Sequence, residues 1–219
     1  MKTKPKIYKR FLAYVIDYII ITLLAGVLSL LLINSEKYNE DTQKVLKLTE
    51  QYVNKEIELE EYQTKYNEYN YDLTLDSVGV TGITIGVTVI YFVVMCYFCH
   101  GITLGKYIMK IKIVSANDKD LNILHYFLRS LIVNSLLSNI VIILMVKCLS
   151  KQSFISSYTY VSDAFSILLI VTFIFMIYRE DGRGLHDLLG NTKVVSISKE
   201  KTDEVEDANI IKETKEKKK

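Results

Sequence analysis

Long apolar segments are the feature of this sequence that most constrains its fold. Two of them, residues 11–33 and 77–99, contain a single charged residue, Asp17. As helices rising about 1.5 Å per residue they would be roughly 34 Å long, enough to cross the hydrocarbon core of a bilayer. Two shorter apolar segments follow, the first of them interrupted by Asn and Ser. We therefore expect an all-α polytopic membrane protein with four transmembrane helices, over about residues 11–33, 77–99, 129–147 and 159–178.

The composition agrees with a chain divided into apolar and charged blocks. Of the 219 residues, 50% are hydrophobic and 24% are charged, with one proline and a mean hydropathy of +0.19. These values exclude a disordered chain and a collagen-like fibre. The net charge of +2 provides no basic field for nucleic acid, and three cysteines do not make a disulfide framework. The expected partner is the lipid bilayer.

The first apolar segment could instead be a secretory signal, because the residues before it are basic. Its apolar core is far longer than the roughly 7–15 residues of such a signal, and no convincing cleavage site follows, so we expect a retained anchor. Lys and Arg are concentrated in the short segments 1–10 and 100–129, whereas the segment 34–76 is acidic. This distribution predicts a multi-pass protein of the cell membrane with both termini cytoplasmic.

The acidic segment 34–76 has a helical repeat of its own. Tyr, Leu and Val recur on one heptad frame, which predicts an extracytoplasmic amphipathic helix or helical hairpin. The residues on this frame are Val45, Leu48, Tyr52, Leu59, Tyr62, Tyr66 and Tyr69. Two roles stay open for this insert: a solvated element whose Tyr side rests on the membrane interface, or a surface for an extracytoplasmic partner through residues 40–70.

Two short stretches on the inner side have the pattern of β-strands. Residues 107–114 alternate between apolar and basic, and residues 192–197 are again strand-like. Each stretch alone would leave its backbone groups unpaired, so we expect them to pair as a small cytoplasmic β element. The tail, residues 199–219, is almost entirely charged or polar and is expected to be disordered.

An aspartate inside a membrane span is the first candidate for a functional group. Arg10, Ala13 and Asp17 share one helix face. Because helical side chains lean toward the N-terminus, a direct pair between Asp17 and Arg10 is not expected. Asp17 should instead meet a group on another helix or on the inner segment, as a proton- or cation-binding carboxylate or as a structural anchor. Arg129 is a reasonable counter-charge for Asp17 or Asp187.

Other polar groups carry less specific chemistry. A polar stripe on the third helix either joins helices or lines a polar path. It consists of Asn134, Ser135, Ser138 and Asn139. His186 and Asp187 are too few for a zinc site, and we expect them to lock the inner segment against the helices. Gly101 to Lys106 lacks the spacing of a nucleotide-binding loop. We expect no enzyme activity, no cofactor and no metal site.

The ordered set of motifs resembles the RDD family of bacterial membrane proteins, which is named for one arginine and two aspartates. The matching positions are Arg10, Ala13 and Asp17 in the first helix, then Gly101, Thr103, Gly105 and Lys106, then Arg129, and finally His186, Asp187, Thr192 and Val194. Asp187 is identified as the second aspartate of the name. Asn191 departs from the small residue usual at that position, and the insert is long for the family.

The resemblance implies a transmembrane domain over residues 1–198 but only a limited function. Most members have no assigned role, and cation/proton exchange has been proposed for some of them. One hypothesis is an oligomeric transport component in which Asp17 titrates, Arg10 and Arg129 are its charge partners, and the polar stripe belongs to the path. The other is a non-transporting scaffold in which the Arg/Asp set locks the cytoplasmic segment and the insert engages a partner.

Overall fold

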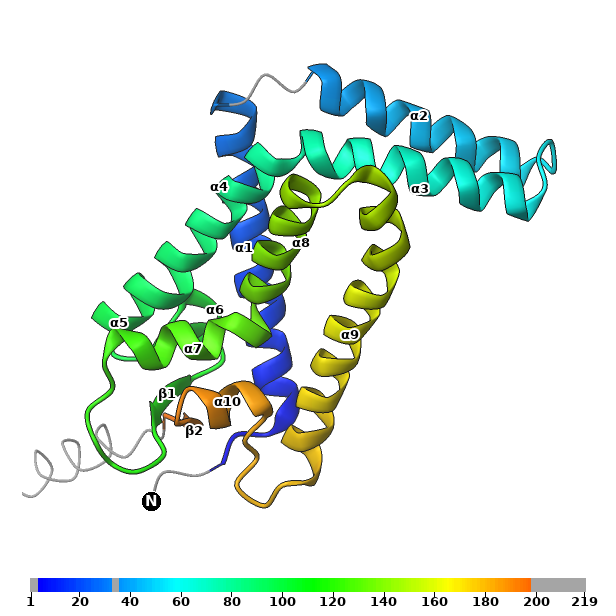
Figure 1. Cartoon of the computed structure of the whole chain (residues 1–219). Coiled ribbons are helices and arrows are strands. Elements are labelled where there is room, and N and C mark those ends of the chain that lie inside the picture. The colour runs from blue at the N-terminus through cyan, green and yellow to red at the C-terminus, as the bar shows by residue number, and fades with distance from the viewer. Residues whose placement is uncertain (1–3, 33–35, 198–219) are drawn as a thin grey trace, which may run out of the picture.

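The computed structural model describes residues 4–32 and 36–197. In these ranges the chain forms a bundle of long helices with a helical hairpin at one end and a small sheet at the other (Figure 1). We refer to the end with the hairpin as the hairpin end and to the end with the sheet as the sheet end. The predicted tail, residues 199–219, lies outside the described residues.

Three helical segments are long and apolar enough to cross a membrane. They are α1, Ile7–Leu32; the segment of α4, Val78–Val89, η1, Ile90–Met95, and α5, Cys96–Phe98; and α9, Lys151–Tyr178. The pair α7, Ile123–Val133, and α8, Leu136–Cys148, passes the same test as one bent span. The chain is therefore an all-α polytopic membrane protein with three or four spans. α9 begins at Lys151 rather than near residue 159. Ser150 caps this start, because its hydroxyl accepts a hydrogen bond from the backbone N–H of Ser153.

The third span differs from the single helix expected over 129–147. α7 and α8 meet at an angle of 67°, and Ser135 at the bend has a φ of 54°, in the left-handed region. Asn134 donates its side-chain amide to the Ser130 hydroxyl over 3.0 Å, and the Ser138 hydroxyl donates to the carbonyl of Ser135 over 2.9 Å. Short polar side chains compete with the helical backbone in this way. The polar stripe therefore marks a break in the helix.

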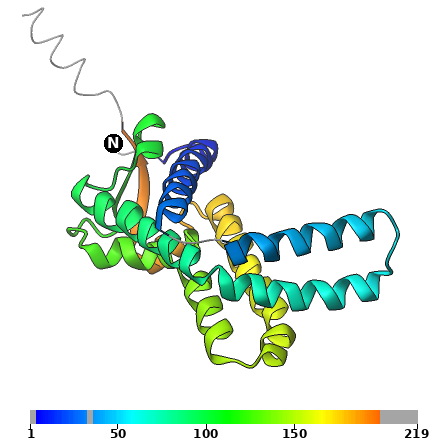
Figure 2. The ribbon, with the colours of Figure 1, turned by 90° about the horizontal axis from the view of Figure 1, so that it is seen from above.

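The insert forms the predicted helical hairpin, with α2 over Glu36–Val53 and α3 over Leu59–Asp76. Tyr62 stacks between Tyr52 and Tyr66, with ring centroids 4.7 and 5.7 Å away. Figures 1 and 2 show the hairpin extending sideways, away from the long axis of the bundle. Its base is fixed to α9, because Lys151 lies 2.9 Å from the Asp72 carboxylate.

The sheet end gathers the short elements that follow the spans. α6, Leu104–Ile108, leads into β1, Ile111–Ser115, and α10, Leu185–Leu189, leads into β2, Thr192–Ser196. The two strands pair antiparallel with Ile113 opposite Val194, which confirms the predicted pairing. Both side chains belong to a buried apolar cluster that includes Ala13 of α1 and Cys96 of α5. The core of the protein therefore joins the sheet to the ends of two membrane helices.

The bend between α7 and α8 gives a test of the fold. A left-handed backbone costs an L-residue about 1–2 kcal/mol, and glycine avoids that cost. We expect Ser135→Gly to maintain or raise the thermal stability of the purified protein, and Ser135→Val to lower it. Ser166→Val, in ordinary helical backbone on the exposed face of α9, is the control. Equal effects of valine at both positions would show that the bend does not need the left-handed residue.

Candidate functional site

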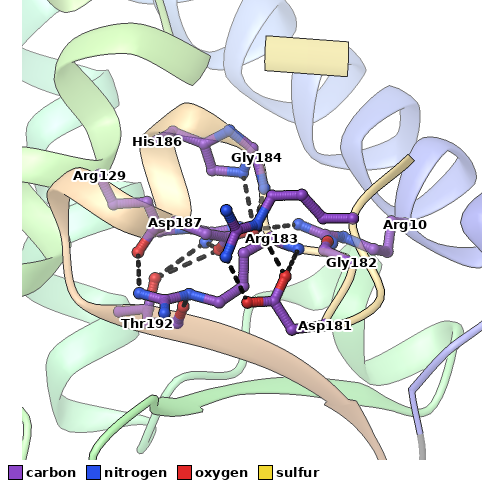
Figure 3. A network of polar contacts seen from close by, with 10 residues as sticks. Arg10, Arg129, Asp181, Gly182, Arg183, Gly184, His186, Asp187 and Thr192 are labelled. Carbon is purple, nitrogen blue, oxygen red and sulfur yellow. Dashed lines mark hydrogen bonds and ion pairs between the residues drawn. The ribbon is translucent and has the colours of Figure 1, made fainter. Parts of the chain in front are cut away.

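Asp187, in the first turn of α10, is the most enclosed charge of the described chain, with none of its surface exposed. Arg10 of α1 places a guanidinium nitrogen 2.5 Å from one carboxylate oxygen, and Arg129 of α7 contacts the other. Thr192 of β2 and the backbone N–H of Gly184 also donate to the carboxylate, each over 3.2 Å. Figure 3 shows these groups converging from four parts of the fold. One carboxylate thus joins α1, α7, α10 and β2.

The loop before α10 is held by arginines as well. Arg10 also donates to the carbonyl of Gly182 over 2.5 Å. Arg183 donates to the carbonyls of Thr192, over 2.9 Å, and Asp187, over 3.3 Å. Farther out, Arg179 pairs with Asp181 at 2.8 Å and lowers the pKa of that carboxyl to about 2. The polar network of this end therefore extends from the buried charges around Asp187 to an exposed ion pair.

His186 lies beside Asp187 and is buried, with its Nε2 3.4 Å from a carboxylate oxygen of Asp187. Burial, reinforced by the positive charges of Arg129, Arg10 and Lys106, lowers the pKa of His186 well below its usual range. The ring is therefore neutral at neutral pH. With its N–H directed to Asp187, its Nδ1 is an acceptor, and within the described chain that atom has no hydrogen-bond partner.

Asp17 forms a second buried site, two helical turns along α1 from Arg10 and 1% exposed. One of its oxygens accepts hydrogen bonds from the Tyr91 hydroxyl, over 2.6 Å, and from the backbone N–H of Gly105, over 2.7 Å. The other accepts from the Thr103 hydroxyl over 2.5 Å and lies 3.7 Å from the Lys106 ammonium. Lys106 also donates to Thr103 over 3.1 Å. Asp17 is thus bonded on both oxygens by η1 and α6.

Gly105 is required for this approach of α6 to α1. A β-carbon at this position would lie 2.2 Å from the backbone oxygen of Ala13 and 2.8 Å from a carboxylate oxygen of Asp17. Gly101, with a φ of 86°, has the same role against β1, because its β-carbon would lie 2.2 Å from the carbonyl of Ile113. Gly105 therefore allows α6 to approach α1 at the carboxylate, and Gly101 allows the preceding turn to approach β1.

A cavity of about 280 Å³ lies between α1, α7 and α9 at the sheet end. Its polar wall includes Asp17, Lys106 and the two arginines that pair with Asp187, together with His186 and hydroxyl and amide groups: Arg10, Asp17, Lys106, Arg129, Ser130, Asn134, Thr172 and His186. The rest of its lining is mostly apolar. The two buried charge sites therefore share one opening.

The profile of the RDD family matches residues 4–191. The chain belongs to the RDD family. Comparisons with curated proteins and with solved structures give no match. The match covers the elements of the two buried sites up to α10 and ends just before β2 and Thr192, so both carboxylates and their charged partners are part of the RDD domain.

The RDD motif residues come together, and the pairing of Arg129 with Asp187 is one of the two that the sequence left open. Asp17 meets a group from another helix, as expected, yet Arg10 and Arg129 pair with Asp187 rather than with Asp17. The lean of helical side chains toward the N-terminus explains this, because Arg10 points beyond the start of α1, toward α10. Asp187 joins α10 to α1 and α7 through its pairs with Arg10 and Arg129, and His186 lies beside it in the same helix; a locking role for His186 and Asp187 stays a prediction.

Sequence reasoning did not assign the four partners of Asp17. Thr103, Gly105 and Lys106 entered only as motif residues, and Tyr91 as part of an apolar run. A tyrosine hydroxyl buried in a membrane helix needs a hydrogen-bond partner, which is the signal that could have identified Tyr91. Of the polar stripe, Asn134 lies on the wall of the cavity, whereas Ser135, Ser138 and Asn139 are absent from its described lining.

The Asp187 cluster predicts that substitutions of two nearby aspartates, Asp187 and Asp181, change the stability of the protein by very different amounts. Asp187→Asn leaves two buried guanidinium groups without their counter-charge, and we expect a loss of about 3–5 kcal/mol. Asp181→Asn removes an exposed pair and should change stability little. Thermal unfolding of both purified variants measures the difference. Similar small effects at both positions would contradict a structural role for Asp187.

The contact at Gly105 predicts a steric effect. Gly105→Ala should destabilise the protein by at least about 1–3 kcal/mol, because the new methyl group collides with backbone. Gly86→Ala in α4 is the matched control, since its β-carbon meets no atom within 4 Å. Folded yield and thermal midpoint report the difference. If Gly105→Ala were as stable as Gly86→Ala, α6 would not pack on α1 at this distance.

Proposed function

We propose that this RDD protein is a transport component of the cell membrane that exchanges a cation for a proton at Asp17 and Lys106. One observation carries the proposal: a buried ammonium lies 3.7 Å from a buried carboxylate on the wall of a cavity. Ionisable groups at membrane depth are costly and commonly mark ion or proton pathways.

The pair has the chemistry that exchange requires. Burial lowers the pKa of Lys106, so its proton leaves more readily than that of an exposed lysine. Loss of this proton leaves the Asp17 carboxylate without its cation, and a cation from solution can then take the same place. The net charge of the site is equal in both states, so one proton exchanges for one monovalent cation.

The same proposal includes the orientation and assembly expected from the sequence. The Lys and Arg near the start of α1 and around α6 support a cytoplasmic position for the sheet end. The cavity lies at that end, so a path to the opposite face needs further walls. We propose that a second copy of the chain provides them in a homo-oligomer.

Ion flux in proteoliposomes tests the exchange. Under imposed pH and sodium or potassium gradients, Asp17→Asn and Lys106→Gln should each lower flux more than tenfold at matched insertion, because each removes one member of the pair. Asp72→Asn, an exposed aspartate of the hairpin, is the control and should transport as the wild type. Normal flux in Asp17→Asn would refute the carboxylate role, and absence of flux in the well-folded wild type would refute exchange.

A scaffold is the second candidate, and the shape of α2 and α3 favours it. The hairpin extends away from the spans (Figure 2), and Leu46, Val53 and Leu59 on it are more than half exposed. Both oxygens of Asp17 are bonded within the fold, as a structural anchor requires.

In the scaffold reading, the hairpin holds an extracytoplasmic partner. Replacement of residues 40–70 by a short Gly-Ser linker should then remove a co-purifying membrane or secreted protein while leaving the bundle folded, because the bundle's own buried sites lie at the sheet end. Quantitative co-purification from native membranes measures the loss. Recovery of the same proteins with the linker variant would contradict this role.

A further inference from the structure

The cavity between α1, α7 and α9 opens on the lipid-facing side of the bundle. Four aromatic and aliphatic residues both line it and stay exposed: Ile7 at 38%, Phe11 at 57%, Leu169 at 39% and Phe173 at 43%. They belong to α1 and α9, which are both candidate membrane spans. An apolar chain in the bilayer can therefore reach the mouth of the cavity without crossing water.

Part of the polar wall of the cavity lies near the ends of the two spans. Arg10 is three residues into α1, about 5 Å along its axis, and Met176 on the cavity wall is two residues from the end of α9. Lys106 and His186 reach the same wall from the short elements of the sheet end. Arg10 and His186 thus lie near the ends of the two spans, whereas Asp17, with Lys106 beside it, and Thr172 lie deeper, about 15 and 9 Å along their helices.

The buried charges at this wall do not balance. Asp187 is shared by Arg10 and Arg129, and Asp17 faces Lys106. His186 is neutral, so three cations face two carboxylates. The surplus is one positive charge in a site that lipid and protein enclose. An uncompensated buried charge is costly, and an anion beside it removes that cost.

The wall also presents acceptors that lack donors. Thr172 is 3% exposed, and its hydroxyl oxygen has no hydrogen-bond partner among the described residues. The side-chain oxygen of Asn134 and Nδ1 of His186, both on residues of the same wall, lack partners in that part of the chain too. Buried acceptors without donors are rare in folded proteins. A ligand for this site needs hydroxyl donors as well as a negative charge.

We propose that this cavity binds the phosphoglycerol headgroup of an anionic lipid, which enters sideways between α1 and α9. The phosphate lies toward Lys106 and the arginines, the glycerol hydroxyls donate to Thr172 and Asn134, and the acyl chains remain against Phe11 and Phe173. The volume of about 280 Å³ is just below the roughly 300–1,000 Å³ of sites for drug-sized ligands. It holds a headgroup while the chains stay in the bilayer.

Native mass spectrometry of the full-length protein, delipidated in detergent, tests the proposal without any ion gradient. Phosphatidylglycerol is compared with phosphatidylcholine of the same acyl chains, which has neither net charge nor hydroxyl donors. We expect at least tenfold tighter binding of phosphatidylglycerol, and equal binding of the two lipids would overturn the proposal. Because flux is not measured, failure of the exchange reaction leaves this outcome unaffected.

Two variants separate the site from general lipid contact. Thr172→Val removes a hydroxyl that makes no bond within the described protein, so stability without lipid should stay unchanged while phosphatidylglycerol affinity falls about fivefold, the equivalent of one hydrogen bond. Ser166→Ala, on the exposed part of the same helix, is the control and should bind as the wild type. Unchanged affinity in Thr172→Val would remove this cavity as the binding site.

A competition experiment identifies the source of the headgroup. Glycerol 3-phosphate carries the same phosphate and hydroxyl groups without acyl chains. We expect it to displace phosphatidylglycerol only at concentrations more than tenfold higher than the lipid itself requires. Displacement at equal concentration would show that the cavity takes a soluble phosphate ester, and would overturn the assignment to lipid.

Discussion

The need to neutralise two buried carboxylates governs the whole sheet end of this protein. Asp187 cannot lie unpaired at zero exposure, and its two arginines come from α1 and α7. Satisfying that one group fixes where three helices meet and where β2 begins. Asp17 has the same effect on α6 and η1 through Tyr91 and Gly105. Charge pairing and hydrogen bonding, rather than apolar packing alone, therefore set the geometry of this end.

Much of this fold follows from the sequence because length and periodicity are local properties. The apolar run that includes Asp17 became α1, the heptad of tyrosines became the hairpin, and the two alternating stretches paired as strands. The prediction was wrong about one straight third helix. Asn134 and Ser135 are compatible with a helix or with a bend, and the left-handed conformation of Ser135 depends on side-chain bonds that spacing does not reveal.

The site was harder to predict than the fold, because pairing between distant residues is a tertiary property. The sequence named Arg10, Asp17, Arg129 and Asp187 as a group but could not assign which arginine meets which aspartate. The direction of helical side chains excluded one pair correctly. Lys106 could not be predicted as the cation beside Asp17, because their contact depends on the close approach of α6 to α1 at Gly105. No local sequence pattern contains that approach.

The separation of Arg10 and Asp187 along the chain, 177 residues, has a consequence for biosynthesis. At about 5–20 residues per second, a ribosome needs roughly 10–35 s to reach Asp187 after it has made Arg10. During that time Arg10 of α1 has been synthesised but its counter-charge, Asp187, has not. The buried cluster therefore cannot form until synthesis has passed Asp187, close to the end of the residues that match the RDD family.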